Sequence, residues 1–342
     1  MSLSSNHWIV IQPVIVGCYV DDLCCLYDSD APGSLYADFV SALQHRWKVE
    51  DEGPVSDLLN VEFSRLRNGD VRLTQGSYID RMVQRYLAAN DAPIDVKLPP
   101  CDDRLRDVVN AAIQAKDGDS YVKDEATASE FQSILGSLLY CATNSRPDVV
   151  WVAFAVAMLG RAMSCPTTEL LERARHVLRY LRAHRDVGLT YSASCRAPLS
   201  GMSDASWETR HSTSGFNFQF GQASISWSSK KQPSVALSSC EAEIMAASEA
   251  TKEAIYLRHF LEELDEGTVD ALSLSVDNKA AIDLAYNPEH HQKLSTSSAV
   301  ISTCARSSSR VSWWSPLWPP LTTWPTSSPR LSMARNSLAC VT

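Results

Sequence analysis

This 342-residue chain lacks both a long apolar run and an excess of basic residues. The opening apolar stretch, Trp8–Val16, contains Gln12 and Pro13 and has no basic flank, so it predicts neither a signal peptide nor a membrane span. Lysine and arginine number 31 against 40 acidic residues, giving a net charge of −9. Because phosphate binding normally needs a basic face, the composition alone does not indicate a nucleic-acid partner.

The cysteines also lack a recognisable metal-binding pattern. None of the ten forms a C-x-x-C pair or has the spacing of zinc ligands. This predicts reduced thiols in an intracellular protein, mostly buried as small apolar residues. Apolar residues make up 45% of the chain, enough for real cores, and the length predicts two or three units.

Three acidic residues stand at expected structural joints. Asp204 and Asp277 each end an apolar run, and Glu243 lies near the start of a long predicted helix, 240–264. Acids at strand ends and on a helix facing the sheet can converge on one point. Converging carboxylates repel one another unless cations lie between them, and Mg²⁺ is the natural occupant. Two such ions about 4 Å apart clamp the attacking and leaving oxygens of a phosphodiester.

The stretch Gly201–Ile282 resembles the ribonuclease H domain of copia-type retrotransposon Pol polyproteins. The phrases S-D-A-S-W, E-A-E-I-M-A and D-N-K-A-A occur in the family's order. The resemblance makes Asp204, Glu243 and Asp277 the catalytic residues and metal ligands, with two Mg²⁺ ions, or Mn²⁺, as cofactors. The phrase E-I-M-A-A favours Glu243 over Glu241, which lies two residues away on roughly the opposite helix face.

The resemblance also implies the fold, a mixed α and β class with a ribonuclease H-like sheet flanked by helices. Apolar runs predict its strands at 199–203, 216–220, 225–229 and 272–276. The expected units in chain order are a partial reverse transcriptase palm hairpin and thumb (1–95), a linker (96–125), a helical connection (126–195), the ribonuclease H-like domain (196–292) and a disordered tail (293–342).

Near the N-terminus, Y-V-D-D lies between two apolar, β-branched runs, which predicts a hairpin with Asp21 and Asp22 at its tip. A bare D-D pair is usually a solvated turn. With these flanks it resembles the palm hairpin of reverse transcriptases, where both aspartates face the metals. The family's other palm aspartate belongs upstream of this hairpin, so we expect a polymerase remnant that does not extend a primer.

Three basic residues are candidate nucleic-acid contacts. Lys230 and Lys231 precede the helix that bears Glu243, and they either steer phosphate or form a solvated basic pair. Arg146 can contact a phosphate, although capping a helix end or pairing with Asp148 is favoured. Separately, Trp207 and Trp227 are expected to pack in the core rather than stack on bases.

After Lys293 the character of the chain changes to Ser, Thr, Pro and Trp, with no acidic residue. The family's H-I-[DE]-x-R phrase, which carries a fourth metal-site carboxylate, and its T-A-D-N phrase are not in this frame. A frame starting at the third base of each codon turns both Trp-Pro pairs, 318–319 and 324–325, into alanine and permits the missing phrases. We therefore interpret this tail as out-of-frame translation.

The resemblance implies two-metal hydrolysis of RNA in RNA–DNA hybrids, coupled to RNA-directed DNA synthesis. The partners would be an RNA–DNA hybrid and other Pol parts of the same element, with no membrane, in a cytoplasmic virus-like particle or the nucleus. The alternative is a catalytically inactive relic with weak nucleic-acid binding. A basic part elsewhere in a larger protein would explain the acidic charge, and the lost fourth carboxylate predicts impaired activity.

Overall fold

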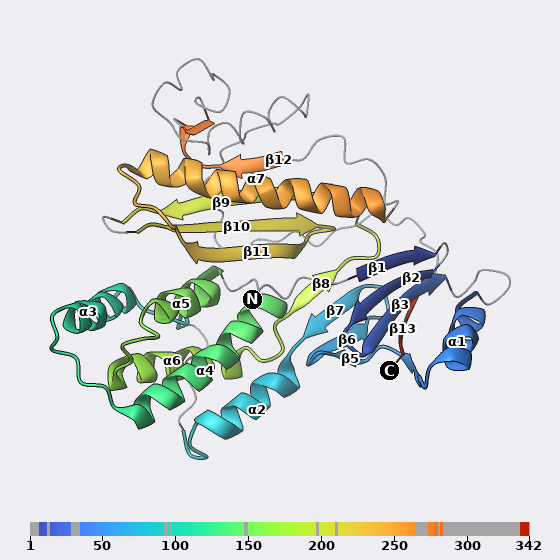
Figure 1. Cartoon of the computed structure of the whole chain (residues 1–342), viewed down its shortest axis with the longest axis horizontal. Helices are drawn as coiled ribbons and strands as arrows, with labels where there is room; N and C mark the ends of the chain where they lie inside the picture. The colour runs from blue at the N-terminus through green and yellow to red at the C-terminus, as the bar shows by residue number, and fades with distance from the viewer. Residues whose placement is uncertain are drawn as a thin grey trace.

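The computed structural model describes residues 7–11, 14–28, 35–91, 95, 98–146, 150–195, 198–208, 211–264, 273–279, 281–282 and 336–341. These residues form seven helices and three sheets (Figure 1). The predicted mixed α and β fold class is confirmed. No helix among the described residues is long and apolar enough to cross a bilayer.

The first sheet is built on the predicted N-terminal hairpin. Its strands in spatial order are β1 (His7–Ile11), β2 (Val14–Tyr19), β3 (Asp22–Asp28), β13 (Asn336–Val341) and β4 (Asp51–Pro54). Helix α1 (Leu35–Arg46) covers it, with Val40 buried in a small core with Val16 and Cys25. Tyr19 pairs with Asp22 to close the turn.

Strand β13 differs from the expectation of a disordered tail. Residues 336–341 pair antiparallel with β3 on one side and with β4 on the other. The edge of β3 offers backbone N–H and C=O groups that an extended segment can pair with, whatever its side chains. Residues 283–335, which include the stretches on which the frameshift hypothesis depends, lie outside the described residues.

A second, small sheet joins distant parts of the chain. Its strands in order are β5 (Asp57–Leu58), β6 (Val61–Arg65), β7 (Val71–Thr74) and β8 (Leu189–Tyr191). The β6–β7 hairpin turns at Gly69, whose φ of +89° suits glycine, as the N-G-D sequence predicts. Gly188 precedes β8 and passes so close to Leu73 that any side chain would overlap its carbonyl oxygen.

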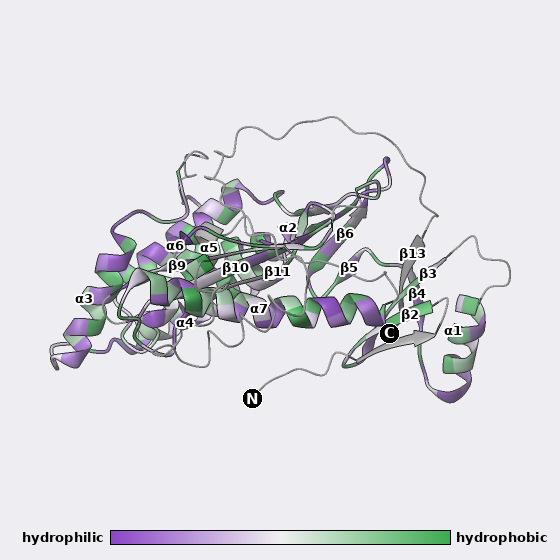
Figure 2. Ribbon diagram, turned by 90° about the horizontal axis from the view of Figure 1, so that it is seen from above, coloured by the Kyte–Doolittle hydropathy of each residue, from purple (hydrophilic) through white to green (hydrophobic). Residues whose placement is uncertain are grey.

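The helical body contains α2 (Gly76–Tyr86), α3 (Leu105–Asp117), α4 (Glu125–Asn144), α5 (Val150–Arg161) and α6 (Thr168–Ala183). Asp124 and Thr167 cap the N-termini of α4 and α6 with their side chains. Phe131, Leu138 and Leu178 lie in the shared core and are completely or almost completely buried. The helices carry both hydrophilic and hydrophobic residues, as expected when one face packs inward (Figure 2).

Helix α3 corrects part of the expected linker. Residues 105–117 form a helix, and Leu105, Val109 and Ala112 are buried against the helical body. These residues recur at the spacing of one helix face, so packing fixes the segment in spite of its polar composition. The segment before it, at residues 98–104, is described without regular secondary structure.

The third sheet has the order β11 (Ala223–Lys231), β10 (Thr213–Phe220), β9 (Ser200–Ser206) and β12 (Ser273–Val276). The first three strands are antiparallel and β12 joins β9 in parallel, so the sheet is mixed, as the resemblance implies. Helix α7 (Ser239–Glu263) covers the sheet, with Ile244 and Ala247 buried against Phe218. Gly201 leaves the room that the Phe218 ring fills.

The third sheet contacts the helical body through its edge strand β11 (Figure 1). The Trp227 indole N–H on β11 donates to the carbonyl oxygen of Ala142 on α4, at 2.8 Å. Beyond β9, Glu208 accepts from Arg161 of α5 at 3.0 Å and lies 3.6 Å from Arg106 of α3. These contacts hold the end of β9 against the helices.

Candidate metal centre

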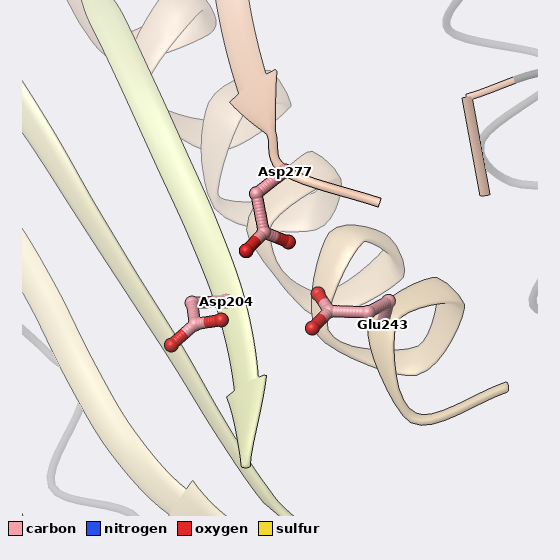
Figure 3. Close-up of side chains that lie close together, drawn as sticks. All are labelled: Asp204, Glu243 and Asp277. Atoms are coloured by element: carbon pink, nitrogen blue, oxygen red, sulfur yellow. The ribbon is translucent and has the colours of Figure 1, made fainter. Parts of the chain in front are cut away.

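Three elements bring Asp204, Glu243 and Asp277 together (Figure 3). Asp204 lies near the end of β9, and Asp277 follows directly after β12. The two strands are parallel, with Val276 opposite Ser203, so their carboxyl ends meet at one edge of the sheet. Glu243 lies in the first turns of α7 and points from the helix toward the two aspartates.

The three carboxylates lie close enough to share cations. One oxygen of each lies within 4.8 Å of the corresponding oxygens of the other two. Glu243 is buried, with 6% of its surface exposed, whereas Asp204 and Asp277 are exposed. The cluster therefore has a closed inner side, formed by the helix, and an open side at the sheet edge.

Glu243 has little to stabilise its negative charge. Its Oε1 accepts a hydrogen bond from the Ala205 backbone N–H at 3.2 Å, and its buried Oε2 has no hydrogen-bond partner. Burial raises the pKa of Glu243 to about 8, and the charges of Asp204 and Asp277 add to this rise. Without a cation, this carboxyl group favours its protonated form at neutral pH.

Asp204 is affected in the same direction. Partial burial raises its pKa, the charge of Asp277 raises it further, and the Ala205 backbone N–H opposes the rise. The like charges nearby thus disfavour the ionised forms of Asp204 and Glu243 unless a cation enters. The cluster is thus built from groups that gain free energy when a cation neutralises them.

This donor set fits Mg²⁺ or Mn²⁺. Both ions prefer carboxylate oxygens, and a Mg²⁺ site commonly combines one or two protein carboxylates with water and substrate phosphate oxygens. The unpartnered Oε2 of Glu243 supplies an inner ligand atom, and the two exposed aspartates leave the outer side open. Asp204, Glu243 and Asp277 are the residues that would hold the ions.

The neighbouring Glu241 serves the helix start instead. Ser238 caps α7 by accepting from the Glu241 N–H at 3.2 Å, and the Glu241 side chain accepts from the Leu237 N–H at 2.8 Å. The two contacts satisfy one backbone donor in the first turn of α7, that of Glu241, and one just before the helix, that of Leu237. Of the two glutamates, the structure brings only Glu243 into the cluster.

The basic candidates are placed differently from one another. Arg146 is completely buried and donates to the carbonyl oxygen of His184, the C-cap of α6, at 2.9 Å. Phosphate contact by Arg146 is therefore wrong, and its structural role is that of a helix cap. Lys230 and Lys231 are exposed at the end of β11, where Lys230 pairs with Ser214.

The two tryptophans, Trp227 and Trp207, also differ in burial. Trp227 is partly buried with a bonded N–H, as expected for packing. Trp207 is 45% exposed, so the expectation of core packing is wrong for its ring. Its indole N–H donates to the Ala236 carbonyl oxygen at 3.2 Å and thereby joins the end of β9 to the loop before α7.

Asp21 and Asp22 do not form a comparable site. Asp21 is exposed at the hairpin tip, and Asp22 begins β3. Among the described residues, the Asp204 cluster is the one group of three potential ligands that could hold a metal ion. The sequence also gives no sign of Gln232, a buried residue beside the cluster, because its partners lie 18 and 10 residues away along the chain.

No family model matches the chain. The Pol polyprotein of transposon TNT 1-94 from Nicotiana tabacum is 30% identical over 295 residues, 85% of this chain and 21% of that protein. The putative transposon Ty5-1 protein YCL074W of Saccharomyces cerevisiae is 31% identical over 250 residues, covering 70% of this chain and 74% of that one. The chain thus spans about a fifth of the length of the tobacco polyprotein.

A shorter stretch is 42% identical over 131 residues to secreted RxLR effector protein 161 of Plasmopara viticola, covering 37% of this chain and 90% of that protein. Among solved structures, a foamy viral protease-reverse transcriptase in complex with double-stranded DNA is 14% identical, covering 66% of this chain and 36% of that one, with a TM-score of 0.35. With matches to transposon proteins across most of its length, this chain belongs to the Pol polyproteins of copia-type retrotransposons.

Proposed function

We propose that this chain binds two divalent cations at Asp204, Glu243 and Asp277 and cleaves the RNA strand of an RNA–DNA hybrid. The observation that carries the proposal is the convergence of three carboxylates within 4.8 Å, from two strand ends and a helix. Family membership supports the choice of substrate. When bound, the ions would stabilise the attacking and leaving oxygens of a phosphodiester.

The three acidic residues have different roles because they differ in exposure. Asp204 and Asp277 are exposed and would hold the ions on the side from which a phosphate approaches. Glu243 is buried, and one of its oxygens is engaged by Ala205, so the other is available to hold an ion and orient the attacking water. The fixed hydrogen bond positions this carboxylate before substrate arrives.

The substrate would be held partly outside the cluster. Lys230 and Lys231 lie exposed on the strand beside β10, at the end of the sheet where Ala205 pairs with Ser214. We assign them to phosphate contact, with other Pol parts of the same element supplying further basic surface for a chain of net charge −9. We expect the protein to act in the cytoplasmic virus-like particles of the element or in the nucleus.

A second candidate is a relic that binds hybrid weakly and does not cleave it. The specific observation is that the cluster holds three carboxylates among the described residues, whereas the family resemblance implies four. A missing ligand lowers ion occupancy and loosens the geometry at the reacting phosphate. This candidate predicts ion binding without turnover.

The deciding experiment uses the purified chain with Mg²⁺ and an RNA–DNA hybrid labelled on the RNA strand. Cleavage of the RNA in the hybrid, with single-stranded RNA and duplex DNA left intact and with none in Asp204→Asn, supports the ribonuclease. Hybrid binding without cleavage supports the relic. Equal cleavage by Asp204→Asn would mean a contaminating nuclease and would remove the proposed function.

A further inference from the structure

Gln232 is a buried polar residue directly after β11, with 2% of its surface exposed. Its side-chain nitrogen donates to the Ser214 hydroxyl oxygen at 2.8 Å and to the Ala242 carbonyl oxygen at 2.9 Å. Its backbone N–H donates to the Ser212 carbonyl oxygen at 2.7 Å. One side chain thus joins the sheet to the first turn of α7.

The assignment of the amide nitrogen follows from its partners. A carbonyl oxygen only accepts, so the atom that faces Ala242 must be the nitrogen. Both hydrogens of this nitrogen are used, whereas the buried Oε1 of Gln232 has no hydrogen-bond partner. The contact therefore depends on two donors at one atom rather than on the shape of the side chain alone.

The two side-chain hydrogen bonds of Gln232 complete a ring of contacts that includes Glu243. Ser214 is the register partner of Ala205, whose N–H donates to Glu243. Ala242, the other acceptor, precedes Glu243 in α7. Sheet, glutamine, helix and glutamate are therefore linked in a continuous circuit.

We propose that Gln232 is a positioning residue for Glu243. By fastening the start of α7 to β10, it keeps the Glu243 carboxylate on the Ala205 N–H and directs the unpartnered Oε2 into the cluster. Its role in cleavage rests on the proposed function, but its effect on the Glu243–Ala205 hydrogen bond does not. Loss of a residue that orients a metal ligand commonly lowers metal affinity by about 10- to 100-fold.

The test compares Gln232→Met with Gln75→Met. Methionine keeps the length and approximate volume of glutamine but has no donor. Gln75 is a matched control because it is also completely buried and also bonds a serine, accepting from Ser145 at 2.7 Å, but it joins α2 to α4. Gln232→Met removes two buried side-chain hydrogen bonds and Gln75→Met removes one, and only the first substitution alters the ring of contacts that includes Glu243.

The first readout is hydrogen exchange of the Ala205 amide in the metal-free protein, measured against the other β9 amides. Glu243→Ala sets the scale, because it removes the acceptor. We expect at least about tenfold faster exchange of Ala205 in Gln232→Met, with little change in Gln75→Met. Wild-type exchange in Gln232→Met, or no acceleration in Glu243→Ala, would overturn the proposal.

The second readout is the dissociation constant for Mn²⁺ alone, followed by hybrid cleavage. We expect Gln232→Met to weaken Mn²⁺ binding about tenfold and Gln75→Met to leave it unchanged. Unchanged Mn²⁺ affinity in Gln232→Met overturns the positioning role. If the wild type does not cleave hybrid, or does not bind Mn²⁺, the proposed function fails, and the Ala205 exchange still decides the positioning of Glu243.

Discussion

Two sets of acidic residues resemble metal sites of the family, and the structure arranges them differently. Asp21 and Asp22 are adjacent in a single hairpin, with Asp21 in the turn after β2 and Asp22 at the first position of β3. Asp204, Glu243 and Asp277 are 39 and 34 residues apart (243 − 204 and 277 − 243), yet their oxygens lie within 4.8 Å. Neighbouring acids on a turn point into solvent, whereas acids brought in by separate elements can share one space.

The hairpin and the cluster differ in how far the fold removes their carboxylates from water. At the hairpin tip, Asp21 is exposed, so water can stabilise its charge. In the cluster, helix α7 buries Glu243 against two other carboxylates, which is costly until a cation neutralises them. Distance and burial together, rather than the number of acids, distinguish the cluster as the candidate metal centre.

The largest expected effect is on hybrid cleavage. Asp204→Asn removes a negative ligand from the open side of the cluster and should lower the rate at least about a hundredfold. The double change Asp21→Asn and Asp22→Asn should leave the rate unchanged. Single-turnover cleavage of labelled hybrid measures both, and a large loss in the hairpin variant would break the comparison.

The next effect is stabilisation by ions. A ligand that binds only the folded state at a hundred times its dissociation constant adds about 2.7 kcal/mol to the free energy of unfolding. Saturating Mg²⁺ should therefore raise the melting temperature of the wild type and of the hairpin variant by several degrees. Glu243→Gln should show much less of this rise, and an equal rise in all three proteins would contradict the assignment.

The pH dependence of the metal-free protein should follow Glu243 and Asp204, whose pKa values are raised in the folded state. A raised carboxyl pKa means that the folded state holds its proton more tightly. Its stabilising contribution is full below the unfolded pKa, about 4.5 for Glu243, and is lost as the pH rises through about 8.

Denaturant titrations from pH 4.5 to 8 should therefore show falling stability in the wild type. Glu243→Gln should flatten this slope and raise stability at pH 8 by roughly 1–3 kcal/mol. The hairpin variant should retain the wild-type slope. Stability that rises with pH across this window would show that the cluster is not under electrostatic strain.

The smallest effect should come from the helix start. Ser238→Ala removes the side-chain cap of α7 and should cost about 1 kcal/mol of unfolding free energy. Glu241→Gln should change stability less, and it should leave Mn²⁺ affinity unchanged because its side chain bonds Leu237 rather than the cluster. Denaturant titration measures the two stability changes, and calorimetric titration with Mn²⁺ measures the affinity. Weakened Mn²⁺ binding in Glu241→Gln would contradict the assignment of Glu243 alone to the cluster.

The sequence predicted the cluster well because each acid follows a local signal. Asp204 and Asp277 end apolar runs, and Glu243 lies near the start of a predicted helix. The position of each acid in its strand or helix could therefore be predicted from the sequence. The helix in the expected linker was missed, although Leu105, Val109 and Ala112 recur at helical spacing. The polar composition of the segment favoured the interpretation as a linker.

Other features depend on contacts that no local pattern records. Arg146 donates to His184, 38 residues later, and Gln232 donates to Ser214 and Ala242. Trp207 looks like a core residue by type, but its place beyond the end of β9 leaves the ring half exposed. Such features follow from the assembled sheet and helix rather than from any one segment.

The most direct test of the metal centre is an anomalous difference map from a crystal of the chain soaked in Mn²⁺. The account predicts Mn²⁺ bound directly by carboxylate oxygens of Asp204, Glu243 and Asp277. It also predicts no peak at Asp21 and Asp22. A peak at the hairpin with none at the cluster would contradict the account.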